Sequence, residues 1–215
     1  MGRSNIAIII PAKNESFTIK KVIRHCARYG TVIVIDDASS DETGKISKLN
    51  GAIVLKNKKN LFYDKSLNRG FDYAFKKKFQ FAITIDADGQ HDLNKIPKFI
   101  NFLKSGYDLI LGKRKKLPRI SEKTISYYYK RKFKIKDIYC GMKGYNLQKL
   151  STFKIFDRFG SIGTDLATRV MKDKRFKFKE ILVKIKKRKD KPRIGNILFA
   201  NLRIYKSFIL NIIIN

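Results

Sequence analysis

The chain has 215 residues, 43% of them hydrophobic, and this apolar content excludes a disordered chain and suffices for one sizeable core. The 49 Lys and Arg residues outnumber the 18 Asp and Glu residues. The formal net charge of +31 therefore favours anionic partners such as nucleic acid, phosphorylated small molecules or an anionic membrane. The two cysteines, Cys26 and Cys140, exclude a disulfide scaffold and a cysteine-based zinc site.

Apolar runs and helical patterns alternate through the first half of the chain. They predict strands over 6–10, 31–35, 52–55, 81–85 and 107–111. They also predict helices over 16–29, 64–77 and 92–103, and a further helix that begins at a capping box over 39–42 and ends at 49. Continuous apolar strands separated by helices are typical of a mostly parallel sheet covered on both faces. The sequence therefore predicts an α/β fold, whose ligands bind at the carboxyl ends of the strands.

The pattern loosens in the second half of the chain. In order, it predicts a basic loop over 113–123, a helix over 124–133, a glycine-containing stretch over 139–146, a helix over 164–172, alternating apolar and basic residues over 176–185 and a second basic loop over 186–193. No linker long enough to separate two domains occurs. We predict one domain over 1–195 and a C-terminal amphipathic helix over 196–215.

The C-terminal segment carries an apolar stripe at helical spacing, made of Leu202, Tyr205, Phe208, Ile209, Ile212 and Ile213. Arg203, Lys206 and Ser207 lie off the stripe. Such a helix either docks on the core or lies on an anionic membrane surface. Residues 107–215 hold 30 basic and 8 acidic side chains, against 19 and 10 in residues 1–106, although coding bias towards Lys accounts for part of this excess.

Targeting signals are weak in this sequence. The apolar run 6–10 is too short for the core of a signal peptide, and no stretch reaches about 18 uninterrupted apolar residues. The expected location is therefore cytoplasmic, peripheral at the cytoplasmic face of the membrane.

Two carboxylates follow the predicted strand 81–85. Asp86 and Asp88 are two residues apart, so on an extended segment they point to one side. Carboxylates that converge without a basic partner repel each other unless a cation joins them, and a hard divalent ion such as Mg²⁺ or Mn²⁺ fits this need. Gln90 adds a carbonyl oxygen and His91 an imidazole. The alternative to a metal site is a purely structural turn in which Asp92 caps a helix.

Further polar residues end the first two strands. Pro11-Ala12-Lys13-Asn14-Glu15 follows the first, and Asp36-Asp37 follows the second, where a carboxylate can accept hydrogen bonds from a ribose or a base or can cap the next helix. Neither G-x-G-x-x-G nor G-x-x-x-x-G-K-[ST] occurs. Phosphate binding must therefore rely on a metal and on basic side chains.

These blocks, in this order, resemble glycosyltransferase family 2, the inverting enzymes with a GT-A fold. The matching stretches are IAIIIPAKNES, VIVIDDASSDET, ITIDADGQHDLNKIP, LILGKR and DIYCGMKGYN. Within that family, DADGQHD and D-x-x-C-G-M-K are most similar to the polyprenyl-phosphate sugar transferases, such as dolichyl-phosphate mannose synthase. The resemblance covers roughly residues 5–195 and implies a GT-A, Rossmann-like mostly parallel sheet.

The resemblance also implies roles for individual residues. The nucleotide-sugar pocket would be lined by Pro11, Ala12, Asn14, Glu15, Asp37, Lys65, Asp86, Ala87, Asp88 and Asp137. The metal would be held by Asp86, Asp88 and Gln90. The donor or acceptor phosphate would meet Arg114, Arg131, Arg188 and Arg193. One departure is the segment Asn60 to Lys65, where the family often has N-x-G-x-G, and this leaves the base of the GDP- or UDP-sugar open.

The acceptor decides which catalytic residues are needed. A polyprenyl phosphate is already an anion and needs cations, so Asp88 and Arg114 would be catalytic. A glycan or another hydroxyl acceptor needs a general base, for which Asp165 is the candidate, unless it is merely an acid at a helix N-terminus. A basic nucleic-acid-binding protein is the alternative of another class, but it leaves the acidic strand ends unexplained. A nucleotidyltransferase would carry a glycine-rich basic loop after the first strand, which is absent here.

Overall fold

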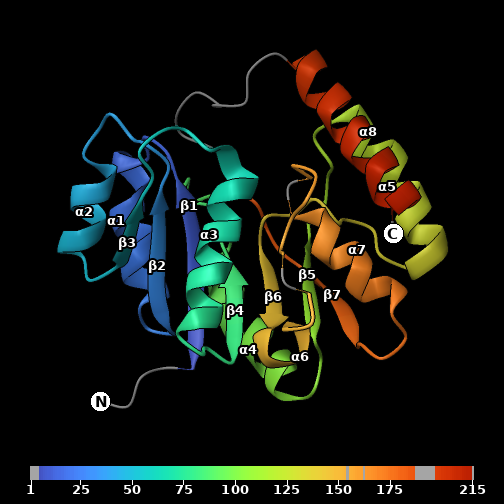
Figure 1. The fold of residues 1–215 in the computed structure, drawn as a ribbon, viewed down its shortest axis with the longest axis horizontal. Coiled ribbons are helices and arrows are strands. Elements are labelled where there is room, and N and C mark those ends of the chain that lie inside the picture. The colour runs from blue at the N-terminus through green and yellow to red at the C-terminus, as the bar shows by residue number, and fades with distance from the viewer. Residues whose placement is uncertain (1–4, 154, 162, 187–196, 215) are drawn as a thin grey trace.

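The protein was analysed as a computed structural model that describes residues 5–153, 155–161, 163–186 and 197–214. Its centre is a seven-stranded sheet in the order β3-β2-β1-β4-β6-β5-β7 (Figure 1). The strands are β1 Ile6–Ala12, β2 Thr31–Asp36, β3 Ile53–Lys56, β4 Phe81–Thr84, β5 Leu109–Lys113, β6 Lys143–Asn146 and β7 Phe178–Leu182. All neighbours are parallel except that β6 runs antiparallel to both β4 and β5. The predicted mostly parallel α/β sheet is confirmed.

Helices cover both faces of this sheet. They are α1 Ser16–Cys26, α2 Thr43–Leu49, α3 Phe62–Lys76, α4 Ile96–Lys104, α5 Ile120–Phe133, α6 Leu147–Leu150, α7 Thr164–Lys172 and α8 Ile197–Ile214. Successive strand side chains point to opposite faces. Ile8 and Ile10 of β1 therefore pack with α1 and α4, whereas Ala7 and Ile9 pack with α3. Helices α5 and α7 pack on the same face as α3.

Two short elements lie outside the sequence-based expectations. The stretch 139–146 contains β6, which is buried between β4 and β5 in the sheet. Its residues Lys143, Gly144 and Asn146 have no apolar strand pattern, so the sequence did not indicate a strand there. The four-residue α6 follows it directly. Helix α5 begins at Ile120 instead of 124, whereas α7 has the predicted bounds.

Helix α8 packs along α5 at the edge of the molecule (Figure 1). The buried side chains of α8 are Ile204, Ser207 and Asn211, exposed by 3%, 2% and 0%. Of the predicted apolar stripe, Tyr205 and Phe208 pack against the core, whereas Leu202 and Ile209 point outward. The reason is that polar side chains of α8 find hydrogen-bond partners on α5 and α7. The boundary predicted at 195/196 lies outside the described residues.

Within the described ranges, the structure contains no helix long and apolar enough to cross a membrane.

Candidate active site

The turns that follow β1 and β2 are tied to each other. Asn14 adopts a left-handed conformation with φ of 53°, and its side-chain oxygen accepts a hydrogen bond from the Ser40 N–H at 2.8 Å. The N–H of Glu15 donates to Thr43 Oγ1 at 2.7 Å. The structure thus places Asn14 and Glu15, with the buried Pro11 before them, beside the loop that carries Asp37.

Asp37 connects three strand ends. Its N–H donates to the Ala12 carbonyl at 2.8 Å, and its carboxylate Oδ1 accepts from the Leu61 N–H at 2.7 Å and from Asn57 Nδ2 at 2.8 Å. The side chain is 5% exposed. Asp37 therefore fixes the entry to α3 next to the ends of β1 and β2, so it shapes the predicted nucleotide pocket as well as lining it.

Asp86 lies at the carboxyl end of β4 with about one third of its side chain exposed. The Tyr63 hydroxyl donates to Asp86 Oδ1 at 2.9 Å, and His91 Nε2 lies 3.5 Å from Oδ2. Asp88 follows, and its Oδ1 accepts from the Gln90 N–H at 3.0 Å. Tyr63 and His91 thus orient the first carboxylate, while a short turn orients the second.

Gly141 allows the Asp86 carboxylate to lie against the chain. A Cβ at this position would sit 2.5 Å from both carboxylate oxygens of Asp86, well inside van der Waals contact. We expect Gly141→Ala to displace Asp86, to lower the free energy of unfolding by about 1–3 kcal/mol and to weaken nucleotide binding. Urea unfolding and calorimetric titration with UDP and GDP measure both effects, and unchanged nucleotide affinity would show that Asp86 is not part of the pocket.

The basic segment that follows β7 begins beside these aspartates. The Lys186 N–H donates to the Gln90 carbonyl at 2.8 Å, Gln90 Nε2 donates to the Lys186 carbonyl at 3.0 Å, and His91 pairs with Ile185 in an isolated β-bridge. The predicted phosphate-binding residues Arg188 and Arg193 lie outside the described residues. The basic segment therefore starts next to Gln90, two residues beyond Asp88.

The residues present fit a hard divalent ion. Among the described residues no three His, Cys, Asp or Glu side chains form a metal-binding group. Mg²⁺, however, typically takes one or two carboxylates and completes its shell with substrate phosphates and water. Asp86 and Asp88, at a partly exposed strand end with the Gln90 amide oxygen nearby, supply that kind of oxygen donor set.

Arg114 and Asp137 are engaged with each other. Arg114 Nε and Nη2 donate to the two Asp137 carboxylate oxygens at 2.7 and 2.8 Å, and Nη2 also donates to Glu122 at 2.9 Å. Asp137 and Glu122 are each 1% exposed. These groups form a buried ion-pair network at the end of β5, and the expectations that Arg114 contacts phosphate and that Asp137 borders the sugar stay predictions.

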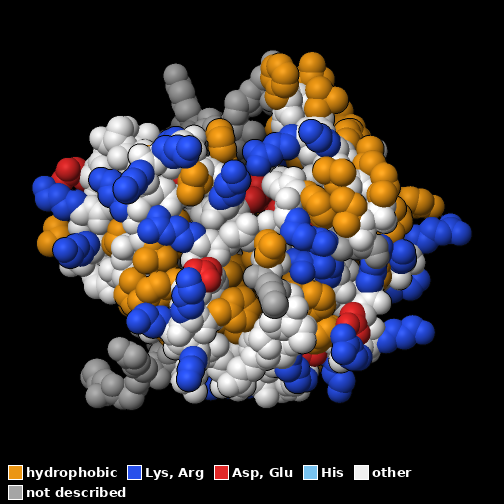
Figure 2. All heavy atoms as spheres, in the orientation of Figure 1, with side chains coloured by type: hydrophobic (Ala, Val, Ile, Leu, Met, Phe, Trp, Pro, Cys, Tyr) orange, Lys and Arg blue, Asp and Glu red, His pale blue; other side chains and the backbone are white. Residues whose placement is uncertain are grey.

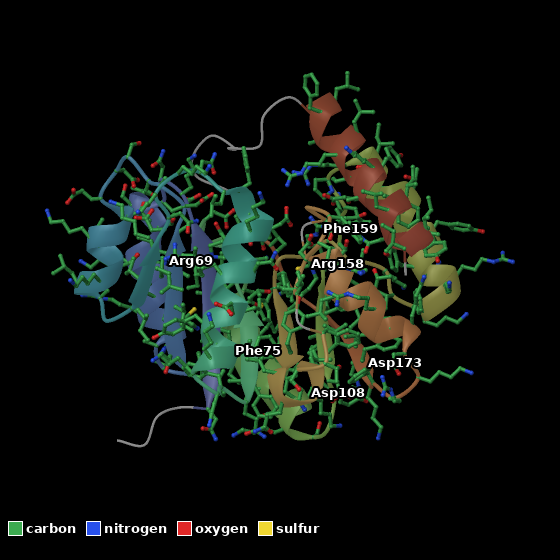
Figure 3. The ribbon with its side chains drawn as sticks, in the orientation of Figure 1. Arg69, Phe75, Asp108, Arg158, Phe159 and Asp173 are labelled. Carbon is green, nitrogen blue, oxygen red and sulfur yellow. The ribbon has the colours of Figure 1, made fainter. Side chains whose placement is uncertain are left out.

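Asp165 also lies in an ion pair instead of facing an acceptor. Its side chain is fully buried, and its carboxylate accepts from Arg158 Nε and Nη2 at 2.9 Å each and from Arg169 at 3.2 Å (Figure 3 labels Arg158). A general base must reach the proton that it removes. Two arginines instead bind this buried carboxylate, so the structure does not support Asp165 as a base.

Two further predicted residues lie away from the aspartates. Arg131 is exposed in the last turn of α5, nine residues beyond Glu122, or about 13 Å along the helix axis from the network around Arg114. Lys65 is exposed in the first turn of α3, where it lines a cavity of about 180 Å³ with Asp157, Arg158 and Arg203 among its neighbours. That Arg131 contacts phosphate stays a prediction.

Lys143 is a charged residue that the sequence-based site did not include. It lies on β6, 2% exposed, and burial lowers its pKa. Its position within the G-M-K-G stretch, at the centre of the sheet, was hidden because β6 has no strand pattern. This buried Lys has Asp86 and Asp137 among its charged neighbours and so lies behind the site.

The lowered pKa of Lys143 predicts a pH dependence of stability. Because the folded state disfavours the ammonium, the contribution of Lys143 to stability is fully present above the unfolded-state pKa of about 10.4 and is lost as the pH falls through the lower folded-state pKa. The wild-type free energy of unfolding should therefore rise relative to that of Lys143→Met as the pH is raised from 7 towards 10. Parallel pH profiles of the two proteins in urea unfolding would refute this expectation.

The mostly parallel sheet flanked by helices has a GT-A, Rossmann-like fold, with the aspartates at its carboxyl edge. Residues 7–162 match the model of glycosyl transferase family 2. The chain belongs to this family.

Known proteins support the same classification. The UDP-N-acetylglucosamine–dolichyl-phosphate N-acetylglucosaminyltransferase of Methanococcus voltae is 31% identical over 139 residues, which cover 55% of each chain. The polyprenol monophosphomannose synthase of Mycolicibacterium smegmatis is 23% identical over 116 residues, covering 50% of this chain and 44% of that protein. The chain thus spans about half the length of these curated relatives.

The fold has close counterparts among solved structures. Glucosyl-3-phosphoglycerate synthase from Mycobacterium tuberculosis, in complex with phosphoglyceric acid, superimposes with a TM-score of 0.76 at 16% identity, covering 98% of this chain and 80% of that one. The same protein has been solved with Mn²⁺, UDP and glucosyl-3-phosphoglycerate. At this identity the likeness concerns the fold alone.

Proposed function

We propose that this protein transfers a sugar from a GDP- or UDP-sugar to a polyprenyl phosphate, with inversion at the anomeric carbon and with Mg²⁺ or Mn²⁺ as cofactor. The observation that carries the proposal is the meeting of Asp37, Asp86 and Asp88 with the start of the basic segment at one edge of the sheet. We place the reaction at the cytoplasmic face of a membrane.

The donor side of the reaction uses residues that the fold already orients. Asp37 and Asp86 would accept hydrogen bonds from the nucleoside, because both lie at the strand ends where ligands of parallel sheets bind. Asp88, Asp86 and the Gln90 amide would hold the divalent ion, which when bound offsets the negative charge that develops on the leaving diphosphate. Lys186 and the segment after it are suited to the remaining phosphate charge.

The acceptor is inferred from the state of the other carboxylates. A hydroxyl acceptor requires a base, but Asp165 and Asp137 are buried and bound to arginines. A phosphate acceptor is already ionised and requires none. The names of the two curated relatives, which act on dolichyl phosphate and form polyprenol monophosphomannose, agree with this choice. A glycan or another hydroxyl acceptor remains the alternative.

In the proposed step, an acceptor phosphate oxygen forms a bond to the anomeric carbon. The bond between that carbon and the β-phosphate oxygen of the donor breaks, and its electron pair leaves with the nucleoside diphosphate. No proton has to be removed from the acceptor. The residues of this chain therefore bind and orient two anions, which matches a basic protein with a small acidic centre. A nucleic acid would instead be repelled by that centre, so we do not propose a specific nucleic-acid partner.

The proposal is tested with a panel of UDP- and GDP-sugars, each with Mg²⁺, Mn²⁺ or EDTA, and with or without a short-chain polyprenyl phosphate in detergent. Release of nucleoside diphosphate should require one donor, a divalent ion and the lipid phosphate together. Turnover that is equally fast in EDTA would refute the metal site, and release that is independent of the lipid would refute the acceptor.

A further inference from the structure

Helix α8 docks through apolar as well as polar side chains, since Ile204, Tyr205 and Phe208 pack against the core. Two of its three buried residues, Ser207 and Asn211, are polar. Asn211 donates to Thr164 Oγ1 of α7 at 3.3 Å, and Asn201 accepts from both the N–H and the hydroxyl of Ser121 of α5. Polar residues thus attach α8 to the protein.

The outward face of α8 is apolar. The exposed side chains are Leu198 (65%), Phe199 (70%), Leu202 (56%), Ile209 (53%), Ile213 (74%) and Ile214 (53%). On the adjacent α5, Ile120 and Tyr127 are exposed by 69% and 68%. Figure 2 shows these helices carrying a gathering of hydrophobic side chains at the upper right of the molecule. Exposed apolar patches of this kind mark interaction surfaces.

The charges around this face have one sign. Exposed cations on α5, on α8 and in the loop before α5 are Lys115, Lys116, Lys123, Lys130, Arg131, Lys132, Arg203 and Lys206. Helix α8 contains no acidic residue, and the one acid of α5, Glu122, is 1% exposed. In Figure 2 Lys and Arg side chains border the hydrophobic gathering. An apolar face with a basic border is complementary to anionic lipid headgroups above an acyl layer.

We propose that the outer faces of α8 and α5 form a surface that docks on an anionic lipid bilayer, with the apolar side chains entering the interface and the lysines and arginines meeting lipid phosphates. On this surface the exposed Arg131 of α5 would contact a lipid phosphate. This inference deepens the proposed function by naming the partner surface, and it rests on that function only in the choice of a bilayer over another apolar partner.

The docking surface is joined directly to the site. Arg203 of α8 donates to the Asp64 carboxylate at 2.8 Å in the first turn of α3. The preceding residue, Tyr63, holds Asp86. Helix α8 is therefore tied through Arg203 to the turn of α3 that carries Tyr63, the residue that holds Asp86.

The test measures binding of the full chain to sedimenting vesicles of phosphatidylcholine alone or with an equal part of phosphatidylglycerol, without any acceptor lipid. The key variant is Leu202→Glu/Ile209→Glu. The matched control is Phe17→Glu/Leu49→Glu, which makes the same charge change at two side chains exposed by 78% and 77% on α1 and α2. We expect the first variant to bind anionic vesicles at least about tenfold more weakly than wild type, and the control to bind as wild type does.

Insertion is read out separately, because the chain has no tryptophan. A single Trp at Ile209→Trp should shift its emission to the blue on anionic vesicles, whereas Phe17→Trp should not. Equal losses in both glutamate variants, or no blue shift at position 209, would overturn the proposal and leave only non-specific attraction by the net charge. Self-association in solution that Leu202→Glu/Ile209→Glu abolishes, without vesicle binding by wild type, would assign the face to a second copy instead. Transfer to a detergent-solubilised acceptor would survive either failure, so the two proposals fail separately.

Discussion

Replacing Asp88 by Asn should reduce sugar transfer at least about a hundredfold while the protein stays folded. The substitution keeps the shape of the side chain and its hydrogen bond from the Gln90 N–H, but it removes the negative charge that a divalent ion requires. The measurement is nucleoside diphosphate release at saturating donor and Mn²⁺, together with the urea midpoint. Raising the Mn²⁺ concentration should recover part of the lost rate.

Asp72→Asn is the matched control for this change. Asp72 is an exposed residue of α3 that pairs with Lys76 at 2.8 Å and lies about 12 Å along the helix axis from Asp64. It removes the same charge from the protein without touching the strand ends, so transfer should remain at the wild-type rate. If Asp88→Asn turned over as fast as Asp72→Asn, Asp88 would not be a metal ligand.

Replacing Asp165 by Asn should destabilise the protein by about 3–5 kcal/mol, because it leaves Arg158 and Arg169 without their buried counter-charge. The loss is measured by urea unfolding, and at temperatures where the variant is folded the pH profile of transfer should match that of wild type. A general base behaves differently, since its loss removes activity and one arm of the pH profile but leaves stability intact.

Asp173→Asn is a control for charge at the other end of α7. Asp173 forms an ion pair with Arg175 that is open to solvent (Figure 3 labels Asp173), so little stability should be lost. If Asp165→Asn were as stable as this control yet inactive, Asp165 would be restored as the base, and the acceptor would be a hydroxyl.

The strand ends could be predicted from the sequence because their pattern is local. Each apolar run of β1, β2 and β4 is followed at once by its polar residues, and parallel strands bring those residues to one edge. The aspartates of the site follow from this rule. Strand β6 does not, because Lys143 and Asn146 are buried by the neighbouring strands and not by any apolar pattern of their own.

The roles of individual charges could not be predicted in the same way. Arg114 and Asp137 are 23 residues apart, one directly after β5 and the other between α5 and β6, so they meet only in the folded chain. The orientation of α8 likewise depends on hydrogen-bond partners that α5 and α7 present to Asn201 and Asn211. In each case a side chain's spacing indicates where it lies on its own element, but not which group neutralises or covers it.

The basic residues of this protein have two different structural roles. Arg114, Arg158 and Arg169 neutralise buried carboxylates, whereas the exposed lysines of α5 and α8 surround an apolar face. The net charge of +31 is therefore better explained by phosphate and lipid partners than by nucleic acid.

The most direct measurement compares two acceptors that differ by one group, a polyprenyl phosphate and the corresponding polyprenol, with a radiolabelled nucleotide sugar and Mn²⁺. Label should enter the organic phase with the phosphate and not with the alcohol, and the product should release free sugar in mild acid. Equal labelling of the polyprenol, or label only in a water-soluble glycan, would contradict transfer to a lipid phosphate.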